Sequence, residues 1–557
     1  MMQKFRMLGC WLILFASIGC SKPESADLLL ISAAVYTLDP DHPWAEAVAI
    51  RDGTIVAVGS NKEITNKFEG PIEALDGRMV LPGFHDAHLH LLGGGIQLLQ
   101  CDLSGLASVP VLLAKVRTCD AALAPGEWLL GGGWNLSLFE RANPSKALLD
   151  AINSERPIYL RGEDGHSSWA NSPALTLAGI GLTTPDPAQG VIERDAAGLP
   201  SGTLRESAQM LLERTLPELP AEKHLEATRM ALRLANSFGI TSMIDASSAA
   251  NEIRAYQYLL DQNELTARMV LSLPVLASIG DTMDGDKIRP DDRDSGKRLR
   301  LDAAKIFVDG VLEGETAALL EPYIGSGGER GMLLIDPDEL KALVTDLDAR
   351  GIQIMFHAIG DMATRVSLDA VAYARNKNGS GDNRHHIAHL QLIDEADRGR
   401  FAELEVGANF QALWAYPDGY ITDINLPAVG AGRVNEMYPL ASLASSGATL
   451  VGGSDWSVTS LNPLEAIETA VTRADESGVV TGVLNLNESM SLADMIKVYT
   501  LNGAFIMHQE DQVGSIEINK WADLVILEKN LFEIPVSAVG DVQVYKTLLQ
   551  GEVVYQR

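Results

Sequence analysis

Met79-Val80-Leu81-Pro82-Gly83-Phe84-His85-Asp86-Ala87-His88-Leu89-His90 is the stretch that decides the fold. An apolar run that continues into alternating residues predicts a strand, on which His88 and His90 share one face with Asp86. Two imidazoles on one strand can bind one metal ion, because histidine is a common ligand of zinc and related metals. The alternative is that both are polar residues at a strand end, before a turn predicted at Gly93-Gly94-Gly95.

Residues 1–19 are typical of a targeting segment. Lys4 and Arg6 precede an apolar run, and small residues lead to Cys20. This pattern resembles a bacterial lipoprotein signal, which implies cleavage before Cys20, lipid on its thiol, and export to the periplasmic side of a membrane or to the cell surface. Because Ser17 stands where leucine is usual, an ordinary secretory signal is the alternative.

The charge of the chain restricts its partners. The 557 residues carry a formal net charge of −30, and loss of the two positive charges in residues 1–19 makes it about −32. An acidic surface repels phosphate backbones and anionic lipid headgroups, which argues against nucleic acid and favours a small-molecule substrate. A homo-oligomer is compatible with the sequence, which does not predict the number of subunits.

Four cysteines are present, and two of them fall in or beside the targeting segment. If Cys10 is removed and Cys20 is lipidated, Cys101 and Cys119 remain. They form either a disulfide in an oxidising compartment or two buried thiols, since their spacing does not match a zinc ribbon.

The two ends of the chain differ from its middle. Residues 20–81 and 507–557 are rich in short apolar runs separated by turn signals, which predicts one β-sheet domain made from both ends. Residues 82–506 alternate helical and strand patterns, such as a helix from Asp336 to Leu347 followed by a strand that ends before His357. This alternation indicates parallel strands with helical crossovers, and a (β/α)₈ barrel is the leading candidate.

Barrel enzymes carry their chemistry at the carboxyl ends of the strands, where this sequence places a set of metal-ligand residue types. The set combines neutral nitrogen donors, one carboxylate and one lysine. Its members are His88, His90, Lys305, His357, His389 and Asp455.

Lys305 is an unusual member, because an ammonium group has no lone pair to give a metal. If the side chain is buried near cations its pKa falls, and the neutral amine can react with carbon dioxide to form a carbamate that could bridge two ions. The alternative is a simple ion pair with Asp309, which shares a strand face with Lys305.

Several segments, in this order, together resemble the metal-dependent amidohydrolase superfamily, and within it the YtcJ-like branch, also called amidohydrolase 3. The resemblance covers about residues 28–557. Its motifs are Pro82–His90, Gly132-Gly133-Trp134-Asn135, Asp164–Ser172, Lys305–Gly310, Gly453-Ser454-Asp455-Trp456, Thr500–Ala504, Gly514–Glu517 and Ala522–Val525.

The resemblance implies a distorted (β/α)₈ barrel, a β-sandwich composed of both chain ends, and an insert domain at about residues 96–220. It further implies two divalent ions, with zinc expected, held by His88, His90, His357, His389 and Asp455 and bridged by carboxylated Lys305. The sequence departs from the pattern at His85, where an apolar residue is usual, and at Ala388, where glutamate is common. His85 should point away from the metals, so neither departure removes a ligand.

The implied reaction is hydrolysis of an amide or N-acyl C–N bond. A divalent ion lowers the pKa of a water molecule toward neutrality, and Asp455 would act first as general base and then as general acid. Asp86 would either orient a histidine or form a structural hydrogen bond. A deaminase, a lactonase or a non-catalytic lipoprotein that binds small molecules are the alternatives.

Substrate contacts are expected from His166 and Trp134 in the insert and from Asp309 and Trp456 near strand ends. The alternative for the tryptophans is simple packing. The remaining histidines have no partner pattern and are expected on the surface or in the core: His42, His224, His385, His386 and His508.

Overall fold

The computed structural model describes residues 22–275, 287–289 and 296–557. The expected signal segment and Cys20 lie outside the described residues. Within the described part of the chain, no helix combines the length and apolar character needed to cross a bilayer.

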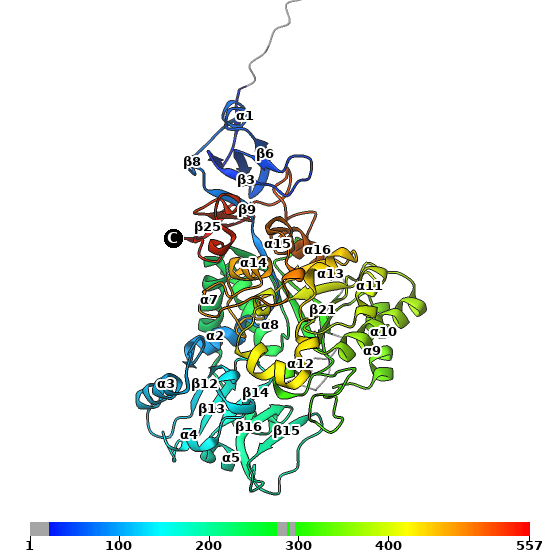
Figure 1. The fold of residues 1–557 in the computed structure, drawn as a ribbon. Helices are drawn as coiled ribbons and strands as arrows, with labels where there is room; N and C mark the ends of the chain where they lie inside the picture. The colour runs from blue at the N-terminus through cyan, green and yellow to red at the C-terminus, as the bar shows by residue number, and fades with distance from the viewer. Residues whose placement is uncertain (1–21, 276–286, 290–295) are drawn as a thin grey trace, which may run out of the picture.

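Eight parallel strands form the central sheet, whose spatial order follows the order in the chain. Helices connect most of the successive strands and cover the sheet from outside (Figure 1), which confirms the predicted barrel. The strands are β10 (Phe84–Leu89), β17 (Ile240–Asp245), β18 (Arg268–Pro274), β19 (Leu299–Phe307), β20 (Gln353–Ala358), β21 (His386–His389), β22 (Gly407–Phe410) and β23 (Leu450–Gly452). The helices are α7 (Ala221–Ser237), α8 (Ala250–Asp261), α9 (Pro337–Ala349), α10 (Asp361–Asn378), α11 (Glu395–Glu403), α12 (Leu426–Val434), α13 (Leu440–Ser445) and α14 (Pro463–Thr472).

The first and last strands approach each other and nearly close the barrel. The Asp455 backbone N–H donates to the His88 carbonyl at 2.7 Å, and the His90 N–H donates to the Trp456 carbonyl at 2.8 Å. Gly453 permits this approach, because a Cβ atom at that position would lie 2.6 Å from the Cβ of His88. The segment after β23 is therefore held against the end of β10.

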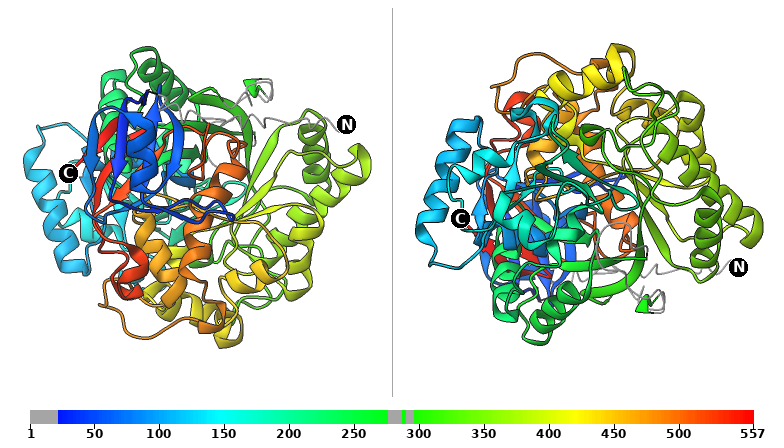
Figure 2. Two further views of the ribbon diagram at one scale, coloured as in Figure 1. Left: turned by 90° about the horizontal axis from the view of Figure 1, so that it is seen from above. Right: turned by 90° about the horizontal axis from the view of Figure 1, so that it is seen from below.

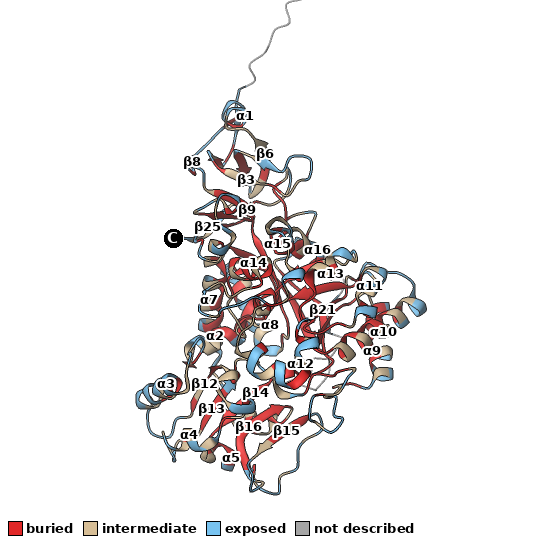
Figure 3. Ribbon diagram, in the orientation of Figure 1, coloured by how far each residue is buried: buried red, intermediate tan, exposed pale blue. Residues whose placement is uncertain are grey.

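The α9–β20 unit illustrates how local sequence sets the barrel geometry. The Asp336 side chain caps α9 by accepting hydrogen bonds from two backbone N–H groups of the first turn. Leu340, Val344 and Leu347 are buried on one face of the helix. After this helix, the buried strand β20 carries His357 at its carboxyl end. Figure 3 shows the same division across the barrel, with buried strands inside and exposed outer faces on the helices.

Strands from both chain ends share one sheet, in the order β26-β25-β24-β9-β3-β4. A second sheet, β6-β5-β2-β8, packs on it through a cluster that includes Leu30, Val48, Val80, Ile526 and Leu548. Figure 2 shows the blue and red strands together. The elements are β2 (Leu28–Ile31), β3 (Ala34–Tyr36), β4 (Trp44–Ala45), β5 (Ala47–Arg51), β6 (Thr54–Gly59), α1 (Asn61–Lys67), β8 (Ile72–Ala74), β9 (Met79–Pro82), β24 (Leu524–Leu527), β25 (Val544–Leu549) and β26 (Glu552–Gln556), and the short strands β1 (Glu24–Ser25) and β7 (Phe68–Glu69) pair with each other.

The segment between β10 and α7 in the chain forms a separate six-stranded sheet. This sheet lies at the end of the molecule opposite the two-sheet unit (Figure 1). Its core contains Trp134 and Trp169, and a disulfide joins Cys101 to Cys119. The disulfide resolves the alternative left open by the sequence. The elements are β11 (Cys101–Asp102), α3 (Val109–Ala122), β12 (Leu129–Trp134), α4 (Lys146–Asp150), β13 (Ile158–Gly162), β14 (Ser167–Ala170), α5 (Ser172–Leu177), β15 (Gly190–Arg194), β16 (Pro200–Glu206) and α6 (Gln209–Glu213).

The turn predicted at Gly93-Gly94-Gly95 is wrong, because all three residues lie in helix α2 (Leu91–Leu99). The reason is tertiary packing. A Cβ at Gly94 would lie 2.4 Å from the ring of Trp456, and a Cβ at Gly95 would lie 2.4 Å from the Ala227 carbonyl oxygen in α7. The glycines therefore let the helix lie close to its neighbours, despite the cost of glycine in a helix.

We expect the Cys101→Ala/Cys119→Ala double variant to unfold more easily than the wild type. The bridge spans 18 residues, and in the chain-entropy account its loss lowers the free energy of unfolding by about 3 kcal/mol. Urea unfolding followed by tryptophan fluorescence measures this change, since Trp134 and Trp169 lie in the insert core. Reductant should shift the wild type toward the variant and leave the variant unchanged; a wild type that does not respond contradicts the prediction.

Candidate functional site

Three predicted metal ligands meet where the first and last strands approach. The Nε2 atoms of His88 and His90 each lie 3.3 Å from Oδ1 of Asp455. The donor atoms of these three residues all lie within 4.8 Å of one another, so they could hold a metal ion. His88 and Asp455 are buried, while His90 is partly exposed.

Two further predicted ligands lie beside this group. His389 Nδ1 is 3.9 Å from Oδ2 of Asp455, and the ring centroids of His389 and His88 are 4.7 Å apart. The His357 ring lies 4.4 Å from that of His389. Strands β10, β20 and β21 and the segment after β23 therefore bring all four histidines and Asp455 to one mouth of the barrel.

Lys305 lies in the same place. Its Nζ atom is 3.4 Å from His88 Nε2 and 4.7 Å from the centroid of the Phe307 ring. Burial lowers the pKa of the Lys305 ammonium to about 7, although Asp455 opposes the shift. A large fraction of the amine is therefore neutral near neutral pH, as carbamate formation requires.

Asp309 and Trp134 lie away from the cavity, in contrast to the contacts predicted for them. The Asp309 carboxylate accepts hydrogen bonds from the backbone N–H groups of Ala318, Ile359 and Gly360, so it holds loops together and does not pair with Lys305. The indole of Trp134 is fully buried and donates to a backbone carbonyl of β13. Both side chains are already satisfied by the protein.

The donor groups have the properties that a metal needs. Burial lowers the pKa of His88 to about 3 and holds the pKa values of His357 and His389 well below the usual range, so these imidazoles are neutral and keep a lone pair. Burial opposes ionisation of Asp455, but the neighbouring histidines hold its pKa well below the usual range. Among the described residues, His389 Nδ1 and Asp455 Oδ1 are buried without a hydrogen-bond partner. This set fits a divalent metal such as zinc.

Two of the ligand residues have unusual backbone conformations. His389 has φ = 78° and Asp455 has φ = 54°, in the left-handed region that non-glycine residues rarely adopt. Such conformations cost free energy and are concentrated at functional sites. Both occur where the chain leaves a barrel strand, so the strained turns direct these side chains into the site.

Asp86 supports the site through the backbone. Its Oδ1 atom accepts hydrogen bonds at 3.1 Å from the N–H groups of His88 and Ser454, which join β10 to the segment after β23. Of the two roles considered for Asp86, the structure shows the structural hydrogen bond. His85 points to the opposite side, where it packs against Gly503, as the strand pattern predicted.

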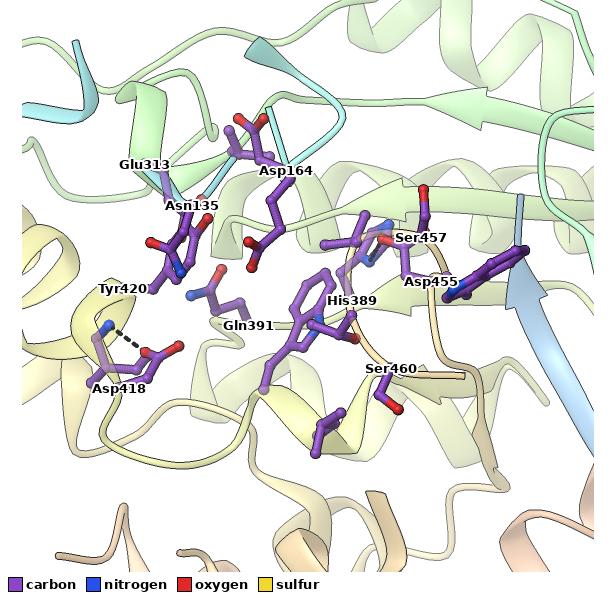
Figure 4. A pocket seen from close by; sticks show the side chains of 18 of the residues that line it. Asn135, Asp164, Glu313, His389, Gln391, Asp418, Tyr420, Asp455, Ser457 and Ser460 are labelled. Carbon is purple, nitrogen blue, oxygen red and sulfur yellow. Dashed lines mark hydrogen bonds and ion pairs between the residues drawn. The ribbon is translucent and has the colours of Figure 1, made fainter. Parts of the chain in front are cut away.

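Two adjoining hollows, each of about 530 Å³, open onto the ligand residues. His166, His357, His389 and Asp455 line both of them. The hollow shown in Figure 4 is also lined by Trp456, so His166 and Trp456 lie where substrate contacts were predicted. The two volumes are in the range of small-molecule sites.

His166 is held as a cation by a carboxylate from the insert. Its Nδ1 atom lies 2.8 Å from Oε2 of Glu206, whose Oε1 accepts a hydrogen bond from the Thr316 hydroxyl at 2.8 Å. Burial lowers the pKa of His166, but the charge and hydrogen bond of Glu206 outweigh burial and raise it to about 9. His166 therefore lines both hollows as a cation whose positive charge is neutralised by Glu206.

Some residues of the site were missed from the sequence. Asp245 ends β17 and lines the hollow that Figure 4 does not show, where it accepts a hydrogen bond from the Tyr256 hydroxyl. Its place at the end of a barrel strand is a signal that could have found it. Glu206, Glu163 and Asp418 also line the hollows; Glu206 ends β16 of the insert, Glu163 directly follows β13, and Asp418 lies in a barrel loop. No periodicity marks such positions.

The histidines expected in core or surface positions lie outside the ligand set. His385 and His386 are buried, and Nε2 of His385 lies 3.0 Å from Oδ1 of Asp348. His42 is exposed, and His224 is partly exposed.

The comparisons with known proteins agree with this geometry. A family model described as "Amidohydrolase family" matches residues 72–555. The putative amidohydrolase YtcJ of Bacillus subtilis is 30% identical over 94% of this chain and 98% of its own length. The N-substituted formamide deformylase of Arthrobacter pascens is 27% identical over 96% of this chain and 99% of its own. An uncharacterized metal-dependent hydrolase of Pyrococcus horikoshii has the same fold, with a TM-score of 0.69 at 23% identity, over 91% of this chain and 99% of that one.

We expect the protein to lose thermal stability after treatment with a chelator and to regain it when Zn²⁺ is added, because an ion that binds only the folded state stabilises it. His88→Ala should contain less metal than the wild type by elemental analysis and should respond less to added Zn²⁺. His42→Ala is the matched control, since this imidazole is exposed. Equal metal content in His88→Ala and wild type would rule out His88 as a ligand.

Proposed function

The chain belongs to the amidohydrolase family, and we propose that it is a metal-dependent hydrolase that cleaves an amide or N-acyl C–N bond of a small molecule. The observation that carries the proposal is the meeting of His88, His90 and Asp455 at the mouth of the barrel. The relative from Arthrobacter pascens, named for its action on N-substituted formamides, supports a C–N bond as the target.

We propose two divalent ions, zinc by donor chemistry, held by the four histidines and Asp455. Lys305, as its carbamate, would join the two ions. The position of Nζ at 3.4 Å from His88 Nε2 and the lowered pKa of this amine, about 7, support that role. When bound, such ions lower the pKa of water and polarise a carbonyl group.

Asp455 is the proton carrier in this proposal. Its carboxylate lies between three imidazoles and lines both hollows, so it can reach substrate. It would accept a proton from the attacking water at a carboxylate oxygen and deliver it to the nitrogen that leaves. Water supplies oxygen to the acyl carbon as the C–N bond breaks, and an acid and an amine are released. The ring of Trp414 lies parallel to that of His389, with ring centroids 5.5 Å apart.

The Asp455→Asn variant is expected to keep much of its metal and to lose turnover by about 10²- to 10⁴-fold, because an amide cannot carry the proton. The measurement is kcat on a panel of N-acyl amino acids, N-formyl amines and lactones, together with metal content.

Asp541→Asn, in an exposed position, is the matched control. Wild-type rates in Asp455→Asn would rule out the assigned role. If the protein opens lactones but cleaves no amide, the C–N assignment is wrong and a lactonase takes its place.

Lys305→Ala should reduce the metal content from about two ions to about one per chain, because the bridging group is lost while His88, His90 and Asp455 remain. Elemental analysis of the purified variant measures this. Lys62→Ala, on the exposed face of α1, serves as the control. Full metal occupancy in Lys305→Ala would show that no carbamate is needed.

We also propose that the protein is exported and tethered through lipid on Cys20. The Cys101–Cys119 disulfide supports a location outside the cytoplasm, because such bonds persist in oxidising compartments. The formal charge of −30 supports a small-molecule partner and argues against nucleic acid.

A further inference from the structure

The hollow drawn in Figure 4 is lined by several carboxylates and by no lysine or arginine. None of its lining residues is lysine or arginine, and its one charged imidazole, His166, is neutralised by Glu206. Figure 4 shows Glu313 and Asp418 across the hollow from His389 and Asp455. The lining acids are Glu163, Asp164, Glu313, Asp418, Asp455, Glu465 and Glu476.

These carboxylates disfavour each other's ionisation. Burial raises the pKa of Glu163 to about 8, and the nearby Asp418 and Asp164 reinforce the shift. Burial likewise raises the pKa of Asp418 to about 7, with Glu313 adding to it. An arrangement of this kind costs free energy in the empty fold, and a positive charge placed among the carboxylates would lower that cost.

Two neutral side chains in the same hollow also point to a ligand. Gln391 and Tyr438 are only 3% and 2% exposed, yet both line the hollow. Among the described residues, neither the Gln391 amide nor the Tyr438 hydroxyl forms a hydrogen bond, and Figure 4 shows Gln391 between Asp418 and His389. Buried polar groups are normally paired, so these two are available to ligand atoms.

An organic cation fits this region better than a metal ion does. In the described part of the chain, the group of three donors close enough to hold one ion is His88, His90 and Asp455, and the acids across the hollow form no such group. The aromatic residues Trp414 and Tyr416 also line the hollow. Aromatic faces beside carboxylates suit an organic cation, through cation–π attraction and charge-assisted hydrogen bonds.

We propose that the substrate is an N-acyl amine that carries a second, protonated amino group. The ammonium lies among Glu163, Asp418 and the aromatic faces while the acyl group lies at Asp455. This inference rests on the proposed function and names its substrate class. A derivative of an aliphatic diamine fits, because a hollow of about 530 Å³ accommodates a small extended molecule.

The test compares three amides that differ only at the far end: N-formyl-1,4-diaminobutane, N-formylpentylamine and 5-formamidopentanoate, with the acetyl series alongside. We expect kcat/KM to fall from the cation to the neutral amide by about 10- to 100-fold, the range for one charge-assisted hydrogen bond, and to be lowest for the anion. A neutral amide that reacts as well as the cation would overturn the proposal.

Variants locate the effect. Glu163→Gln and Asp418→Asn keep the shape of each side chain and remove its charge, so the ratio of kcat/KM for cation to neutral amide should fall by about 10-fold in each. Glu403→Gln, an exposed acid on α11, is the matched control and should leave the ratio unchanged. Circular dichroism confirms folding, and an unchanged ratio in both cavity variants would also overturn the proposal.

A binding measurement separates this inference from the proposed reaction. N-methanesulfonyl-1,4-diaminobutane and N-pentylmethanesulfonamide cannot be hydrolysed, and calorimetry gives their affinities for the wild-type protein. Tighter binding of the cation, lost in Glu163→Gln, supports the inference even if no amide is turned over, in which case only the proposed reaction fails. Equal binding of the two sulfonamides, with turnover of neutral amides, overturns the inference and leaves the proposed reaction standing.

Discussion

The hydrogen bond from the Asp455 backbone to the His88 carbonyl, at 2.7 Å, is the contact on which the site depends. It joins the first barrel strand to the segment after the last one, so donors from opposite ends of the barrel sequence become neighbours. Gly453 makes the approach sterically possible, and Asp86 adds a second link to Ser454. Without this closure, Asp455 would not reach the strand that carries His88.

The barrel core contains ionisable side chains whose burial costs free energy. His88, Lys305, His357 and Asp455 are all buried, and burial opposes the charged form of each. The left-handed backbone at Asp455 adds strain. The surrounding strands and helices form one large hydrophobic cluster, which holds these groups in place. Bound divalent cations would offset this cost, because metals bind neutral imidazoles and ionised carboxylates and so stabilise the folded state.

Local patterns predicted the barrel and the ligand set because both depend on short-range rules. Alternation on β10 separates His88 from His85, and strand ends mark His357. Long-range packing could not be predicted from the sequence: Gly94 lies in a helix at a point where the ring of Trp456 leaves no room for a side chain. Trp134 belongs to a family motif, but only its neighbours show that its indole is buried and bonded within the insert. Gln391 and Glu163 carry no periodic signal.

The division between strands and loops explains how the site combines chemistry with selectivity. Metal donors lie at strand ends, where parallel pairing fixes their spacing, whereas Glu163 comes from the insert and Glu313 and Asp418 come from barrel loops. The two parts meet directly, because the Leu136 N–H of the insert donates to the Tyr420 hydroxyl at 3.1 Å. Docking of the insert therefore sets the distance between the acidic lining and Asp455. A different insert or loop could change the substrate while the metal ligands stay in place.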